Sequence, residues 1–290
     1  MLHGLKILFV GIFVICSAFN TPDAKTYYNS GVHSLNNKEY IEAIGSFTNA
    51  ISLKPDFADA YFYRAYAKDL LGKKMGFANT EMCGDLTTAL KYGKYEAADK
   101  LEKTCMGECY NLVNAFEDPD MVYCADFSNS NLKDLPANTS KLKYLVKLNF
   151  MDNDLGTITP SLASKNSLLS LDLSGNNIST VPANIGNLNQ LRELFLNKNS
   201  ISTLPLEFGK LSHLKVLTFR QNKLTELPRS IAQLTNIETL DLAFNQLTTL
   251  PLEIANLKKL KTLTLVGNEI PIKEQQKIKT LLPNTTVYFE

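Results

Sequence analysis

Residues 168–188 read LLSLDLSGNNISTVPANIGNL, and the apolar residues of this stretch recur at fixed positions along the rest of the chain. Leu191, Asn199 and Pro205 stand 23 residues after Leu168, Asn176 and Pro182, and the apolar residues between them shift by the same step. Seven such registers begin, without an insertion, at residues 122, 145, 168, 191, 214, 237 and 260. Regular self-similarity of this length predicts a solenoid, in which each repeat contributes one turn to a continuous core.

The first apolar positions of each register fit a short strand, and the later ones fill the same core from the other side. Seven strands at a spacing of about 4.8 Å give a parallel sheet about 30 Å across. This pattern resembles the leucine-rich repeat, in its 23-residue type with a Leu-Pro step. The resemblance implies an α/β horseshoe with a concave parallel sheet, over residues 109–290.

One asparagine follows the strand in six registers, and we expect it to be structural. Its amide can donate to and accept from backbone groups that would otherwise be buried without a partner, at a cost of about 1–3 kcal/mol each. The predicted ladder consists of Asn153, Asn176, Asn199, Asn222, Asn245 and Asn268.

The ends of a solenoid must cover its core, and the sequence departs from the repeat at both ends. Residues 108–116 are predicted to form a short capping helix. Residues 273–282 are predicted to form an amphipathic helix and residues 285–289 a final strand.

Residues 24–108 show a second pattern, with Gly31, Tyr40, Ala43, Phe47 and Pro55 at the positions of a 34-residue helical unit. The spacing resembles the tetratricopeptide repeat (TPR). It implies an α-helical array of two repeats and a closing helix, with small residues where the helices meet. A groove lined by Tyr28, Val32, Phe62 and Tyr66 would follow from that resemblance. The alternative is that these side chains pack the array itself.

The first 18 residues are predicted to be a signal peptide. Thirteen uncharged residues from Ile7 to Phe19 are too few to span a bilayer as a helix, which takes about 20. Cleavage after Ala18 would export the chain to the periplasm, the cell surface or the medium, with no transmembrane span in the mature protein. A lipid anchor through Cys16 is the alternative.

Four cysteines follow Cys16, namely Cys83, Cys105, Cys109 and Cys124. In an oxidising compartment they could form two disulfides. Cys83 and Cys105 flank Gly93, the expected turn of a helical hairpin, which favours their pairing and leaves Cys109 with Cys124. Free buried thiols and a metal site are the alternatives.

Composition and motifs give no indication of an enzyme or of a nucleic-acid-binding protein. The formal net charge is +1, with no block of like charge, so no nucleic-acid partner is expected. No phosphate loop, nucleophile elbow or metalloprotease motif is present in the sequence. We therefore expect a non-enzymatic protein without a cofactor or a metal.

The strand residues that point away from the core predict a binding surface on the concave face. Solvent-facing aromatic residues near an arginine are typical of interaction hot spots. We expect a protein or peptide partner, although a structural or adhesion role with a glycan ligand is the alternative, and scattered exposed apolar residues are also ordinary. The candidate partner-binding residues are Lys147, Asn149, Met151, Asp172, Glu193, Phe195, Asn197, Thr218, Arg220, Asp241 and Phe244.

Overall fold

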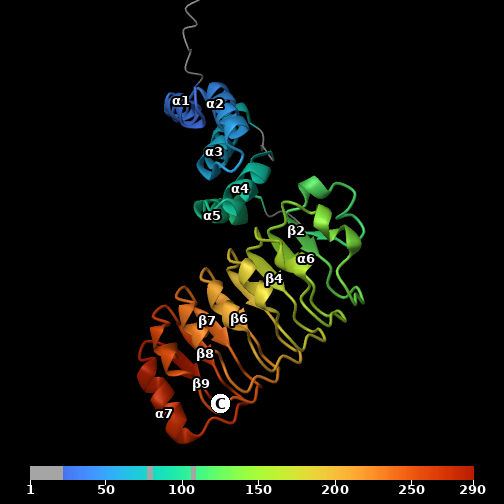
Figure 1. Ribbon diagram of the computed structural model, residues 1–290, viewed down its shortest axis with the longest axis vertical. Coiled ribbons are helices and arrows are strands. Elements are labelled where there is room, and N and C mark those ends of the chain that lie inside the picture. The colour runs from blue at the N-terminus through green and yellow to red at the C-terminus, as the bar shows by residue number, and fades with distance from the viewer. Residues whose placement is uncertain (1–21, 77–80, 106–108) are drawn as a thin grey trace, which may run out of the picture.

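The computed structural model describes residues 22–76, 81–105 and 109–290. In these residues a run of helices leads into a curved nine-stranded sheet (Figure 1). The chain is therefore a helical array followed by an α/β solenoid, as the two sequence patterns predict. The predicted signal segment and Cys16 lie outside the described residues.

Two helix pairs and a closing helix make up the array. A Cβ at Gly31 would lie 2.7 Å from the ring of Phe47, so only glycine lets the first two helices approach this closely. Phe47 is fully buried between them. The helices are α1 (Ala24–Asn36), α2 (Tyr40–Leu53), α3 (Ala58–Met75), α4 (Glu81–Lys91) and α5 (Glu96–Thr104).

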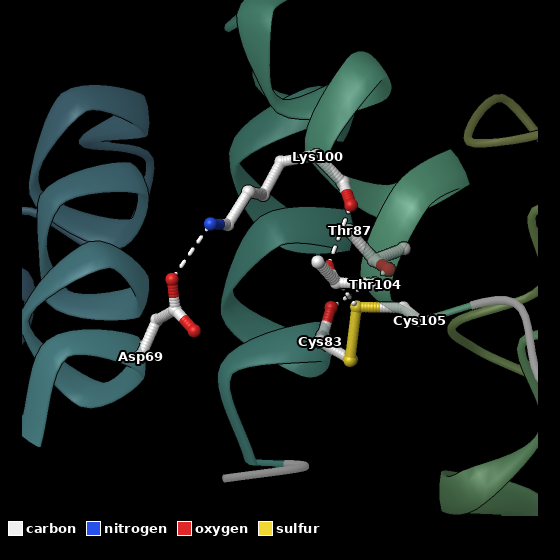
Figure 2. The surroundings of a disulfide bond; sticks show 6 residues. All are labelled: Asp69, Cys83, Thr87, Lys100, Thr104 and Cys105. Atoms are coloured by element: carbon white, nitrogen blue, oxygen red, sulfur yellow. Dashed lines mark hydrogen bonds and ion pairs between the residues drawn. A yellow bond between two sulfur atoms is a disulfide. The ribbon is translucent and has the colours of Figure 1, made fainter. Parts of the chain in front are cut away.

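A disulfide and a buried carboxylate hold α5 in place (Figure 2). Cys83 of α4 is bonded to Cys105, with their Cα atoms 5.7 Å apart. Lys100 Nζ lies 2.6 Å from a carboxylate oxygen of Asp69 on α3. Burial alone would raise the pKa of Asp69, but hydrogen bonds from Lys100 and Lys73 outweigh it and leave that pKa below its ordinary range. The closing helix is thus fixed to both of its neighbours.

The sheet is parallel throughout, and its neighbours follow the order of the chain. Leu148 pairs with Leu171 and Leu171 with Leu194, a step of 23 residues that repeats from β2 to β8. These strands are β2 (Cys124–Asp126), β3 (Lys147–Asn149), β4 (Ser170–Asp172), β5 (Glu193–Phe195), β6 (Val216–Thr218), β7 (Thr239–Asp241) and β8 (Thr262–Thr264).

Short helical turns return the chain along the opposite side of each repeat. Their apolar residues, such as Ile185 and Phe208, are fully buried against the strands, which closes the core. The turns are η1 (Pro119–Met121), η2 (Ala137–Lys141), α6 (Pro160–Ala163), η3 (Ala183–Asn187), η4 (Leu206–Lys210), η5 (Arg229–Gln233) and η6 (Leu252–Asn256).

The asparagine ladder has the hydrogen bonds that its spacing predicts. Asn222 Oδ1 accepts from the backbone N–H of Ile201 at 3.0 Å, and its Nδ2 donates to the carbonyls of Leu196 and Phe219 at 2.8 and 3.0 Å. The other five asparagines bridge adjacent repeats in the same way. Each side chain therefore satisfies backbone groups in more than one repeat.

The ends of the sheet match the sequence prediction at the C-terminus and contradict it at the N-terminus. At the C-terminal end, α7 (Ile272–Leu281) leads to β9 (Thr286–Tyr288), which pairs with β8. At the N-terminal end the predicted capping helix over residues 108–116 is wrong, because β1 (Tyr110–Asn111) and a series of turns occupy its described part, residues 109–116. Tyr110 pairs with Ala125, and the Cys109–Cys124 disulfide holds this strand beside β2.

The helical array packs against the residues that directly precede the first strands of the sheet. Leu86 and Leu101 share a buried cluster with Tyr123, Val146 and Leu169, which precede β2, β3 and β4. The two parts of the chain therefore share one apolar contact.

An ion pair extends this contact along the strand edge. Arg192 Nη1 donates to Asp99 at 2.8 Å and to Glu102 at 3.0 Å, both on α5. The rings of Tyr95 and His213 lie beside it, with their centroids 4.3 Å apart.

Candidate functional site

The concave face is built from the first and last residue of each strand. Because the middle residue of each strand from β2 to β8 is a buried leucine or alanine, its two neighbours point the other way. The strand pairing places each of these residues beside the one 23 positions away, for example Asp172 beside Asn149 and Phe195. All eleven candidate partner-binding residues lie in β3 to β7 or in the turns that follow these strands.

Several polar residues of this face also have a backbone role that the sequence pattern did not reveal. Asp172 Oδ1 accepts from the backbone N–H of Ser174 at 2.8 Å. Asp126, Asn149 and Asp241 make the same contact two residues further along the chain. These side chains therefore shape the turn that leaves each strand, and they are not free to reorient toward a ligand.

Other candidates make contacts within the face. Asn197 Oδ1 accepts from the backbone N–H of Arg220 at 2.9 Å, and Glu193 accepts from Ser170 Oγ at 3.0 Å. Thr218 Oγ1 is buried and has no hydrogen-bond partner within the described residues.

A column of left-handed residues runs along the edge of this face, one in each repeat. Their φ angles lie between 50° and 70°, which glycine adopts freely and asparagine and aspartate tolerate. Four of the seven have such side chains, whereas Lys198, Gln221 and Phe244 do not. The column consists of Asn129, Asp152, Gly175, Lys198, Gln221, Phe244 and Gly267.

Phe244 is the most unusual member of the column. Its ring is 43% exposed. The Arg220 guanidinium lies 4.6 Å from the ring centroid, and a Cβ at Gly267 would lie 2.6 Å from the ring. A large apolar side chain is thus held between an arginine and a glycine while it remains partly exposed to solvent.

A shallow hollow of about 270 Å³ lies next to Phe244 on the same face. Two small residues, Ser174 and Gly175, are part of its lining. It is lined by Met151, Asp152, Asp172, Ser174, Gly175, Asn197, Lys198, Arg220 and Gln221.

The residues expected to line the TPR groove do not meet around one groove. Tyr28 lines an open hollow of about 480 Å³, where its ring lies 5.0 Å from that of Phe57. Val32 packs against the buried cluster of the first three helices. Phe62 and Tyr66 line a separate, small hollow together with Lys100.

A lysine lies over the ring of each of these two residues. Lys94 Nζ lies 5.3 Å from the centroid of Phe62, and Lys100 Nζ lies 6.0 Å from that of Tyr66. Both lysines also form ion pairs with α3, and Tyr66 remains 43% exposed beside them.

A larger cleft of about 600 Å³ lies between the array and the start of the sheet. Its arginine, Arg64, is bound to Asp85 through Nε at 2.9 Å and to Thr48 at 3.1 Å, so its charge is neutralised internally. Burial raises the pKa of Tyr123, on the opposite wall, to about 12. The best-buried charges of this cleft, Arg64 and Asp85, therefore bind each other.

In the three described ranges, no group of three or more histidine, cysteine or acidic residues is placed to hold a metal ion. Within the same residues, every helix is too short or too polar to cross a membrane.

Comparison with known proteins identifies the repeats. Residues 153–282 match the family model of the leucine-rich repeat region. The matched residues include the strands β4 to β8. No curated protein matches the chain.

Two solved structures are similar over part of the chain. A leucine-rich repeat protein of Leptospira interrogans aligns with 59% of this chain and 51% of its own length, at 30% identity and a TM-score of 0.48. A plant peptide hormone receptor, solved in complex with RGF2, aligns with 53% of this chain and 26% of its own length, at 32% identity and a TM-score of 0.46. The chain thus spans about half and about a quarter of these two proteins.

Proposed function

We propose that this protein is a non-enzymatic scaffold that binds a protein or peptide partner on the concave face of its sheet. In this proposal residues 109–290 form the recognition unit, and residues 24–108 form a TPR-like unit docked against it. Residues 1–18 are the signal peptide of an exported protein. The two disulfides support export, because such bonds persist mainly in oxidising compartments.

The observation that carries the proposal is Phe244. A non-glycine residue in the left-handed region costs about 1–3 kcal/mol, and such strain persists chiefly at functional sites. Here it holds an exposed aromatic ring against Arg220, and aromatic residues and arginine are the side chains most enriched among binding hot spots. Aspartate, asparagine or glycine, as in four other repeats, would fit the backbone with less strain.

A capture experiment with matched variants tests the proposal. The mature chain is used as bait in an extract of the source cells, beside a concave variant, Arg220→Glu with Phe244→Glu. The control variant is Leu206→Glu with Leu252→Glu, which changes two exposed residues, 69% and 58% accessible, on the opposite side of the repeats. All three baits are first checked for equal melting temperature.

We expect one partner to be retained by the wild type and the control variant and lost by the concave variant. Retention by all three would contradict the concave-face proposal and would move attention to the hollow at Tyr28. Retention of purified glycan or washed cell envelopes, with no protein partner, would favour the adhesion alternative.

A further inference from the structure

Four charged side chains surround the hollow beside Phe244, and none of them forms an ion pair within the described residues. They are Asp152, Asp172, Lys198 and Arg220. Acidic and basic groups line the same depression, yet no pair comes within 4 Å. Charged residues at the strand edge behave differently, since Arg192 is bound to Asp99 and Glu102.

Local contacts explain why these opposite charges stay apart. Asp172 is held by the backbone of Ser174, and Arg220 lies over the ring of Phe244. The carboxylate of Asp152 packs over Gly175, where a Cβ would collide with it. At least three of the four groups are therefore fixed where they face the hollow, at little further cost in conformational entropy when a ligand binds.

The charges follow an order along the sheet. Asp152 and Asp172 belong to the second and third registers, and Lys198 and Arg220 to the fourth and fifth. Phe244 follows in the sixth register. These five side chains thus run from acidic to basic to aromatic across five neighbouring repeats.

We propose that this hollow binds an extended peptide segment that carries a basic, an acidic and an apolar side chain in that order along the sheet. The inference rests on the proposed function and names the partner's chemistry. Four strand spacings of about 4.8 Å separate Asp152 from Phe244, about 19 Å in all, which an extended peptide covers in about six residues. A basic side chain meets Asp152 and Asp172, an acidic one meets Lys198 and Arg220, and an apolar one packs on Phe244.

Charge order gives this site its specificity. A peptide with its charges reversed would place like charges together, which electrostatic complementarity disfavours strongly. Because the hollow is open to solvent, its charged contacts also weaken as salt rises.

Selection from a library of random peptides of about seven residues tests the inference on the full chain. Three targets are compared: the wild type, Lys198→Gln with Arg220→Gln, and a control, Lys223→Gln, which neutralises an exposed lysine outside the hollow. We expect the wild type and the control to enrich one pattern of basic, acidic and apolar residues. The double variant should lose the acidic position and keep the other two, and it should bind the wild-type consensus peptide at least tenfold more weakly.

Selection of no peptide, or of one pattern by all three targets, would overturn the inference. A fourth target, Phe244→Ala, separates the two proposals. Purely apolar peptides that depend on Phe244 would leave the proposed function standing and remove the charge pattern. Peptides indifferent to both Phe244 and the four charges would remove both.

Discussion

Seven residues at the exits of the strands share a left-handed backbone, and their side chains differ in how well they tolerate it. Gly175 and Gly267 adopt this conformation without strain, whereas Lys198, Gln221 and Phe244 each carry a Cβ that crowds the backbone. At Phe244 the strain positions an exposed ring. Gln221 has no such compensating contact apart from its place in the wall of the hollow.

Gln221→Gly should therefore stabilise the protein. Relief of left-handed strain outweighs the greater freedom of glycine in the unfolded chain, and we expect a gain of about 0.5–1 kcal/mol in the free energy of unfolding. Gln221→Ala is the matched control, since alanine keeps the Cβ and should change little. Chemical denaturation of the three proteins decides the matter, and equal gains for both variants would rule out strain as the cause.

Substitution of a ladder asparagine should destabilise the protein strongly. Asn222→Ala leaves the N–H of Ile201 and the carbonyls of Leu196 and Phe219 without their side-chain partner in a buried setting. We expect a loss of about 3 kcal/mol, from about 1–3 kcal/mol for each unsatisfied group. Asn177→Ala, at the exposed neighbour of a ladder position, should stay within about 0.5 kcal/mol. Thermal unfolding of both variants is the measurement, and similar losses would contradict the structural role of the ladder.

Among the elements, those that repeat could be predicted from the sequence and those that depend on a distant partner could not. The spacing of the leucines places β2 to β8, and the pair of Gly31 and Phe47 places the first two helices. Residues 109–116 were assigned wrongly because their structure depends on pairing with β2 and on a disulfide. The left-handed column could have been predicted from the sequence. Residues that tolerate a positive φ recur at one position of the repeat, namely Asn129, Asp152, Gly175 and Gly267.

Helix α5 depends on an ion pair that responds to pH. The hydrogen bond from Arg192 holds the pKa of Asp99 below its ordinary value. Because the folded-state pKa is lowered, this stabilisation is present above about pH 4, the pKa of an unfolded aspartate, and is lost as pH falls through the folded-state value. Carboxyl NMR titration should give a pKa below about 3.9 for Asp99 in the wild type and an ordinary one in Arg192→Ala. An unchanged pKa in the variant would show that Arg192 is not the cause.

At the scale of the whole molecule, neither repeat pattern predicts the contact between the array and the sheet. Arg192 and Asp99 are 93 positions apart and belong to two unrelated repeats. Each pattern specifies its own core, whereas the contact requires Tyr123, Val146 and Leu169 to stay apolar just before their strands. Those three residues occupy positions of the leucine-rich register that other repeats fill with Arg192, Lys215, Glu238 and Lys261. The change from apolar to charged residues along one column marks where the apolar contact with the array ends.

This contact should make the two parts unfold together. Val146 and Leu169 are almost completely buried against the array, so Val146→Asp with Leu169→Asp would place two unpaired charges there. We expect one calorimetric transition for the wild type and two for the variant, since each part keeps its own core and its own disulfide. Val113→Asp, at a residue that is 82% exposed, is the control and should keep the single transition. Two transitions in the wild type would show that the array and the sheet are coupled too weakly to fold as one unit.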